Sequence, residues 1–167
     1  MTNEELEQEV KRLEEQITNL RIKLLESKAE KKPYEVEVPE DIKNYYYVDA
    51  DGLIESLLSY SDEIQKGIFK RGLAFKTREE AKQHDKERIL LFKLHKWAEE
   101  YNEDWTPNWA DFEEKQYYVV YDYEDKQFYV RYEHYSKTFT KLPYFKSYNL
   151  AEQFIEEFGE EIKEVLC

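Results

Sequence analysis

The chain has little of what builds disulfide frameworks, metal centres and tight loops. It contains one cysteine, at position 167, with four glycines, four prolines and three histidines. A single cysteine excludes an internal disulfide and a cysteine-based metal site. No segment approaches the length of about 18 uncharged apolar residues that marks a membrane-spanning helix. The first residues form a charged, amphipathic segment, so we expect no membrane span, no classical secretion and a cytoplasmic location.

Catalytic signatures are also missing. The sequence has no Gly-x-Ser-x-Gly, no phosphate-binding P-loop, no Gly-x-Gly-x-x-Gly and no His-Glu-x-x-His. His84 and His95 share the flank of one predicted helix, but a metal would need further ligands from elsewhere in the chain. Solvated or packing histidines explain them better. We therefore predict that the protein is not an enzyme and uses neither a cofactor nor a metal.

What the chain does have is aromatic surface and acidic charge. It has fifteen tyrosines and nine phenylalanines, and its 38 acids outnumber its 25 bases for a formal charge of −13. So many aromatic side chains allow a packed core, which a disordered acidic chain would lack. We expect one α+β body with a helical appendage.

Residues 1–32 are predicted to form a coiled-coil helix that joins two copies of the chain. Apolar residues recur there at alternating steps of four and three, the spacing of a coiled-coil seam. Such a helix is marginal when isolated in water, so we expect a homodimer. Packing of the helix on its own domain is the alternative. The seam consists of Leu6, Val10, Leu13, Ile17, Leu20 and Leu24.

The orientation of the two helices stays open. β-Branched residues at alternate seam positions favour a parallel dimer, but a parallel register places Glu9 opposite Glu14. An antiparallel register brings Glu7 near Arg21, and Glu9 near Lys23. Each exposed pair contributes only about 0.2–0.5 kcal/mol, so these charges alone do not decide.

A divergent internal repeat organises the body, residues 44–167. Residues 33–43 before it are predicted to be a linker or an edge strand. The two pseudo-repeats span 45–101 and 117–166, and each is predicted to fold as three antiparallel strands followed by a helix.

Matching motifs carry the repeat. Phe75-Lys76-Thr77 in the first half corresponds to Phe145-Lys146-Ser147 in the second, at a constant offset of 70. Thr77 and Ser147 are suited to cap the helices that follow. We expect those helices to cover the sheet.

Acidic residues cluster between Glu99 and Asp125, where ten acids stand against one base, Lys115. A negative field favours a basic partner, and carboxylates on a stiff scaffold can occupy a groove built for phosphates. Plain solubility is the alternative explanation. The predicted partner-binding residues are Glu99, Glu100, Glu103, Asp104, Trp105, Trp109, Asp111, Glu113, Glu114, Asp122, Glu124, Asp125, Glu156 and Glu160.

Two other functions fit the tyrosine-rich hairpin predicted between Tyr117 and Tyr135. Exposed tyrosines could anchor a protein partner, which would make the protein an oligomeric structural adaptor. Alternatively, Tyr129 and Tyr132 could stack the bases of single-stranded nucleic acid, together with the basic stretch from Lys66. The overall acidity disfavours direct binding of nucleic acid.

Five segments carry a resemblance to known proteins: Tyr45 to Asp49, Phe75 to Ala81, Lys93 to Glu103, Tyr117 to Tyr123, and Tyr144 to Glu152. On these segments the body resembles a family of small acidic proteins encoded in phages and prophages of Gram-positive bacteria. The resemblance implies an accessory protein that acts inside an infected cell. Small acidic phage proteins, anti-CRISPR proteins among them, often block host defence by occluding a nucleic-acid-binding surface. The expected partner is therefore a basic host protein, such as a CRISPR effector nuclease.

Overall fold

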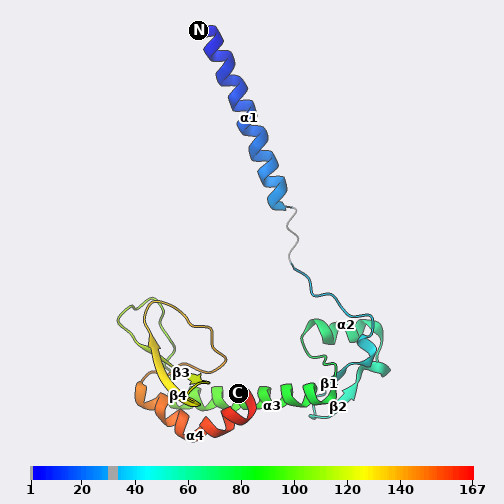
Figure 1. Ribbon diagram of the computed structural model, residues 1–167, viewed down its shortest axis with the longest axis vertical. Coiled ribbons are helices and arrows are strands. Elements are labelled where there is room, and N and C mark those ends of the chain that lie inside the picture. The colour runs from blue at the N-terminus through cyan, green and yellow to red at the C-terminus, as the bar shows by residue number, and fades with distance from the viewer. Residues whose placement is uncertain (1, 30–33) are drawn as a thin grey trace. The chain divides into compact units, whose positions relative to one another are not determined.

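The computed structural model describes residues 2–29 and 34–167, and the chain forms two compact units, residues 1–37 and 38–167 (Figure 1). Helices occur together with antiparallel strands, so the predicted α+β class is confirmed. The first unit contains α1 (Asn3–Ala29). The second contains η1 (Ile42–Asn44), β1 (Tyr46–Val48), β2 (Ile54–Ser56), η2 (Leu57–Ser59), α2 (Asp62–Lys70), α3 (Arg78–Tyr101), β3 (Gln116–Asp122), β4 (Gln127–Glu133) and α4 (Tyr148–Leu166).

The predicted N-terminal helix is one continuous helix, α1, of 27 residues. Residues 30–32 of the predicted range, and Pro33 after it, lie outside the described residues. The seam side chains are all exposed: Leu6, Val10, Leu13, Ile17, Leu20 and Leu24. Pairing of α1 with a second chain stays a prediction.

The first half of the body is built around Leu57, which is fully buried and packs with Ile42 and Tyr45. The β1–β2 hairpin turns at Asp49, whose Oδ1 accepts hydrogen bonds from the backbone amides of Asp51 and Leu53. The left-handed φ of +81° in this turn falls on Gly52, which has no Cβ to strain it.

Helix α2 is not predicted by the sequence pattern. Its nine residues are too few to show a helical period clearly, although Asp62 and Glu63 suit a first turn. A tertiary contact anchors it, because the buried Nε2 of Gln65 donates to the carbonyls of Leu57 and Tyr60 at 2.9 and 2.8 Å. The predicted order of strands and helix in the first half therefore omits one helix.

The second half holds the main core, between α3, α4 and the β3–β4 hairpin. Helix α4 lies alongside the C-terminal half of α3 (Figure 1). Trp97 of α3 makes ring contacts with Phe154 and Phe158 of α4, each with centroids 5.6 Å apart. It also stacks on Tyr101, and its Nε1 donates to Glu157 at 3.0 Å. This indole therefore links the two helices by packing and by a hydrogen bond.

The two halves share local features, although the predicted third strand is only a single bridged residue in each. Tyr46 bridges Phe75 in the first half, and Tyr117 bridges Phe145 in the second. A hydroxyl caps the helix that follows in both: Thr77 Oγ1 accepts from the amide of Glu80, and Ser147 Oγ from that of Leu150. An internal repeat stays an interpretation of these features.

The buried aromatic core gives a direct stability prediction. Phe154 is fully buried, so Phe154→Ala should lower the free energy of unfolding by about 3–5 kcal/mol, measured by urea denaturation. Phe139, which is 91% exposed, is the matched control, and Phe139→Ala should change it by less than about 0.5 kcal/mol. Equal losses in the free energy of unfolding for the two variants would contradict this packing.

A tyrosine pair in the first half gives a pH prediction. The hydroxyls of Tyr47 and Tyr60 lie 2.6 Å apart, and this hydrogen bond, with burial, raises the pKa of Tyr47 to about 12. Because the folded state favours the protonated phenol, its stabilising effect should be complete below the ordinary pKa of about 10 and lost as the pH rises toward 12. In an ultraviolet titration, Tyr60→Phe should move the Tyr47 pKa back toward 10. An unchanged titration would refute the coupling.

Candidate protein-interaction surface

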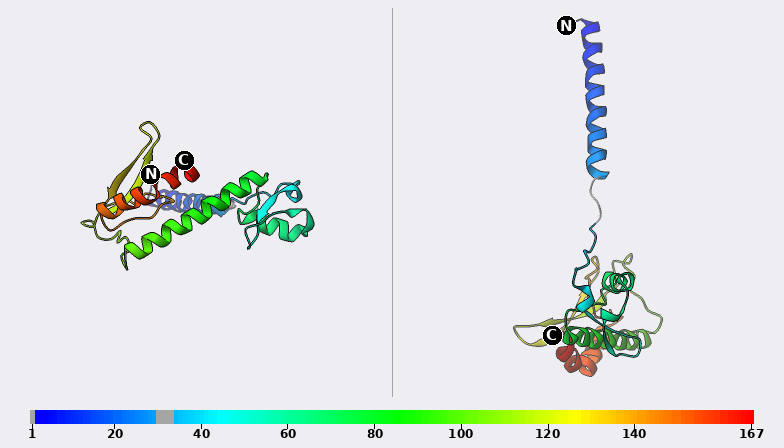
Figure 2. Two further views of the ribbon diagram at one scale, coloured as in Figure 1. Left: turned by 90° about the horizontal axis from the view of Figure 1, so that it is seen from below. Right: turned by 90° about the vertical axis from the view of Figure 1, so that its right-hand side faces the viewer.

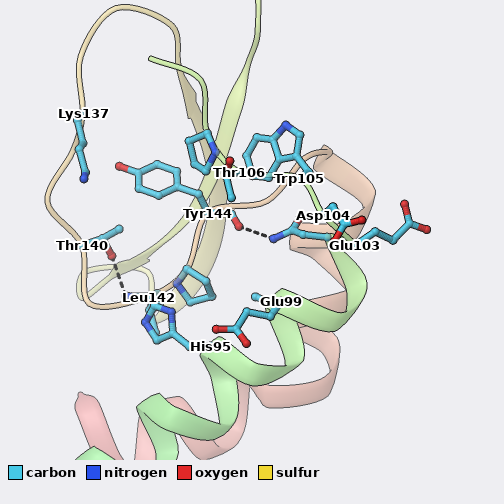
Figure 3. Close-up of a pocket in the computed structure, with 14 residues that line it drawn as sticks. His95, Glu99, Glu103, Asp104, Trp105, Thr106, Lys137, Thr140, Leu142 and Tyr144 are labelled. Atoms are coloured by element: carbon cyan, nitrogen blue, oxygen red, sulfur yellow. Dashed lines mark hydrogen bonds between the residues drawn. The ribbon is translucent and has the colours of Figure 1, made fainter. Parts of the chain in front are cut away.

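The acidic segment begins where α3 ends, and Asn102 fixes that end. Its buried side chain donates from Nδ2 to the carbonyl of Tyr144 at 2.8 Å and accepts at Oδ1 from the amide of Lys146 at 2.9 Å. Glu103 then takes a left-handed φ of +56°, which turns the chain out of the helix. Figure 3 shows Glu99, Glu103 and Asp104 at this end of α3, with the Glu99 side chain pointing toward His95 and the Glu103 side chain pointing away from it.

Glu114 organises the loop that follows. Its Oε1 accepts from Trp105 Nε1 at 2.6 Å, and its Oε2 accepts from the amide of Asn108 at 3.1 Å. Trp109 of the same loop packs edge-on against Tyr144, with centroids 5.2 Å apart. Trp105, Trp109 and Glu114 are therefore half-buried parts of the loop's own structure and offer less to a partner than the sequence suggested.

Three of the predicted acids are neutralised by lysines. Lys96 pairs with Glu99, Lys146 with Glu103, and Lys163 with Glu160. The hydrogen bond from Lys146, together with its charge, lowers the pKa of Glu103. Exposed pairs contribute little to stability, but they reduce the negative field at these three positions.

The remaining acids keep an uncompensated charge. Within the described residues, Asp111, Glu114, Asp122 and Asp125 accept hydrogen bonds only from neutral donors. Five more are exposed, and their side-chain carboxylates form neither an ion pair nor a hydrogen bond with any residue that the structure describes: Glu100, Asp104, Glu113, Glu124 and Glu156. The one base of the stretch, Lys115, lies over the ring of Tyr132 at 4.5 Å.

The tip of the β3–β4 hairpin is acidic and preorganised. Asp122 Oδ1 accepts from the amides of Glu124 and Asp125, and Asp125 Oδ2 accepts from Tyr129 Oη at 3.0 Å, which raises the pKa of Tyr129. Tyr123 at this tip is 69% exposed. Figure 2 shows the hairpin projecting from the helices, so the tip is accessible.

A cavity of about 690 Å³ adjoins the end of α3, between that helix and the segment from Lys137 to Tyr144 (Figure 3). Its polar groups are largely occupied by the fold. His95 Nε2 bonds the carbonyl of Lys141 at 2.9 Å, Tyr144 Oη donates to the carbonyl of Thr138, and Thr140 Oγ1 accepts from the amide of Leu142. Among the described residues, no three acids, histidines or cysteines are placed to hold a metal ion.

Exposed aromatic residues form a second feature, which the sequence showed only in part. Tyr135 is 79% exposed and its ring contacts that of Phe112, with centroids 5.9 Å apart. Lys137 Nζ lies 5.8 Å from the ring of Phe139. Phe139 was not among the predicted site residues, because it lies in a loop with no strand pattern and outside the acidic segment.

Comparison with known proteins gives no relative: no family model, curated protein or solved structure matches the chain. The resemblance to phage proteins therefore stays a prediction. In the part of the chain that the structure describes, no helix combines the length and apolarity needed to cross a membrane.

Neighbouring acids in the loop give a matched pair of variants. Glu114→Ala leaves Trp105 Nε1 and the amide of Asn108 without their acceptor, and should lower the free energy of unfolding by about 1–3 kcal/mol in urea denaturation. Glu113→Ala removes an exposed side chain and should change it by less than about 0.5 kcal/mol. A larger loss of stability for Glu113→Ala than for Glu114→Ala would mean that Glu114 does not hold the loop.

Proposed function

We propose that this chain is a non-enzymatic binding protein whose acidic surface binds and inhibits a basic, nucleic-acid-binding protein. The observation that carries the proposal is the set of nine predicted acids that no lysine or arginine among the described residues neutralises; the carboxylates of five of them are exposed and bond to no described residue. Such carboxylates can meet the cations of a phosphate-binding groove. They favour association by speeding encounter and by disfavouring acidic partners.

The hairpin tip is the part of this surface best suited to binding. The carboxylate of Asp122 is held by two backbone amides and that of Asp125 by the Tyr129 hydroxyl, so these two lose little conformational entropy when they meet a partner. Tyr123 beside them adds an exposed aromatic ring of the kind enriched at binding hot spots.

The resemblance to phage accessory proteins supports a biological setting for the proposal. In that setting the protein acts in the cytoplasm of an infected bacterium, and its partner is a host defence protein such as a CRISPR effector nuclease. Self-association through α1 would make it a homodimer. Direct binding of nucleic acid is not part of the proposal, because the net charge of −13 opposes it.

Charge reversal tests the acidic surface. The triple variant Asp104→Lys, Glu113→Lys and Glu124→Lys should weaken binding to a guide-free CRISPR effector nuclease by at least about tenfold at low salt, as measured by calorimetry. Its charge-matched control, Glu35→Lys, Glu37→Lys and Glu55→Lys, reverses three exposed acids outside the surface and should bind nearly as the native chain does.

Two results would refute this proposal. One is equal binding by the native chain and the Asp104, Glu113 and Glu124 variant. The other is affinity that does not fall when salt rises from about 50 to 200 mM, because association through exposed charges is screened by salt.

The exposed aromatics favour a second candidate, an adaptor that docks a protein through the hairpin. Tyr132 in β4 and Tyr135 just after it are both exposed, which suits an aromatic anchor. Tyr132→Ala with Tyr135→Ala would then abolish partner binding, whereas the charge reversals would not. The two candidates are therefore distinguished by which set of variants fails to bind.

A further inference from the structure

Helix α1 presents an apolar stripe that its own unit leaves uncovered. The six seam residues are between 43% and 65% exposed, and they lie on one continuous helix. A surface hollow lined by Leu6, Glu7, Val10, Lys11 and Glu14 lies beside the stripe, where a side chain of a facing helix could insert. Helices in proteins gain most of their stability from the packing of an amphipathic face, so the stripe calls for a partner helix.

A second copy of α1 matches this stripe in length and in spacing. We propose that two copies of α1 pair in antiparallel orientation, in the register that places Leu6 opposite Leu24, Val10 opposite Leu20 and Leu13 opposite Ile17. Each layer of this register joins two apolar residues, and all six seam residues of both copies become covered.

Flanking charges select this orientation. In the antiparallel register Glu7 of each copy lies near Arg21 of the other, and Glu9 lies near Lys23, which gives four attractive contacts in the dimer. The cost is one like-charge contact at the centre, between the two Glu14 side chains. Glu9 also pairs with Arg12 of its own helix. That pair is exposed and contributes little, so Glu9 can exchange it for the contact with Lys23 of the other copy.

The parallel alternative lacks these contacts. It places Glu9 of each copy opposite Glu14 of the other, which makes two repulsive contacts, and it leaves Arg21 facing the neutral Gln16. The β-branched residues at Val10 and Ile17 do not offset this, because among parallel coiled coils that pattern sets the number of strands.

The orientation has a functional consequence, which rests on the proposed function. The chain continues to the body from the C-terminal end of α1, and in an antiparallel pair these ends lie at opposite ends of a rod about 40 Å long. The two acidic bodies would then be attached at opposite ends of this rod. Such a dimer can engage two sites at once, and avidity can exceed single-site affinity by about 10²–10⁴-fold.

A single substitution distinguishes the two orientations, because it acts with opposite sign in each. Glu9→Lys in the full chain should weaken dimerisation about five- to tenfold in sedimentation equilibrium, since the introduced ammonium group would then face Lys23. In a parallel dimer the introduced ammonium group would face Glu14 of the other copy, and the substitution would strengthen dimerisation. Glu15→Lys adds the same charge on the outer face of the helix and should leave the affinity unchanged.

Disulfide trapping tests the register in the same full chain, with Cys167→Ser to remove the native thiol. A mixture of Val10→Cys and Leu20→Cys chains, equilibrated with glutathione, should give mainly the mixed disulfide dimer. Homodimers of either variant, or a statistical 1:2:1 mixture, would overturn the proposal. So would a chain that stays monomeric at all concentrations. These readouts need no binding partner, so they stand or fall independently of the proposed function.

Discussion

The packing of Trp97 between α3 and α4 positions most of the second half of the body. Its ring contacts join the two helices, and its indole N–H is bonded to Glu157, so the end of α3 is held in one place. Asn102, five residues later, ties that end to Tyr144 and Lys146, the neighbours of the bridged residue Phe145. The acidic loop therefore starts from a fixed point. This anchor matters because a loop alone would not hold its carboxylates in a defined arrangement.

From that point, the acids divide by what they bond. Some carboxylates satisfy backbone amides or an indole inside the loop and turn, some are paired with lysines, and the rest face solvent. This division narrows the interaction surface predicted from composition. The charge that a partner would meet is concentrated on the exposed acids and on the hairpin tip, and less on Glu99, Glu103 and Glu160.

Sequence patterns predicted local structure well where a strong periodic or capping signal was present. Helix α3, Arg78–Tyr101, begins directly after its predicted cap, Thr77, and ends where the first predicted repeat ends. Helix α4 likewise begins directly after its predicted cap, Ser147. Helix α2 was missed because a contact with Gln65, and not its own short sequence, holds it in place.

The site was harder to predict than the fold, because it depends on partners far apart in the chain. The sequence marks Glu103 and Glu114 as equivalent acids, yet one pairs with Lys146 and the other holds Trp105. Nothing local distinguishes them. Only the return of the chain at Tyr144 and Lys146 beside the end of α3 brings the neutralising lysine to Glu103.

Competition between the protein and nucleic acid for one basic partner tests the central claim most directly. A guide-free CRISPR effector nuclease is first saturated with this protein, guide RNA is added, and the composition of the complex is measured by native mass spectrometry. If carboxylates occupy the phosphate-binding groove, guide RNA and protein exclude each other. A stable ternary complex of nuclease, guide RNA and protein would contradict the account.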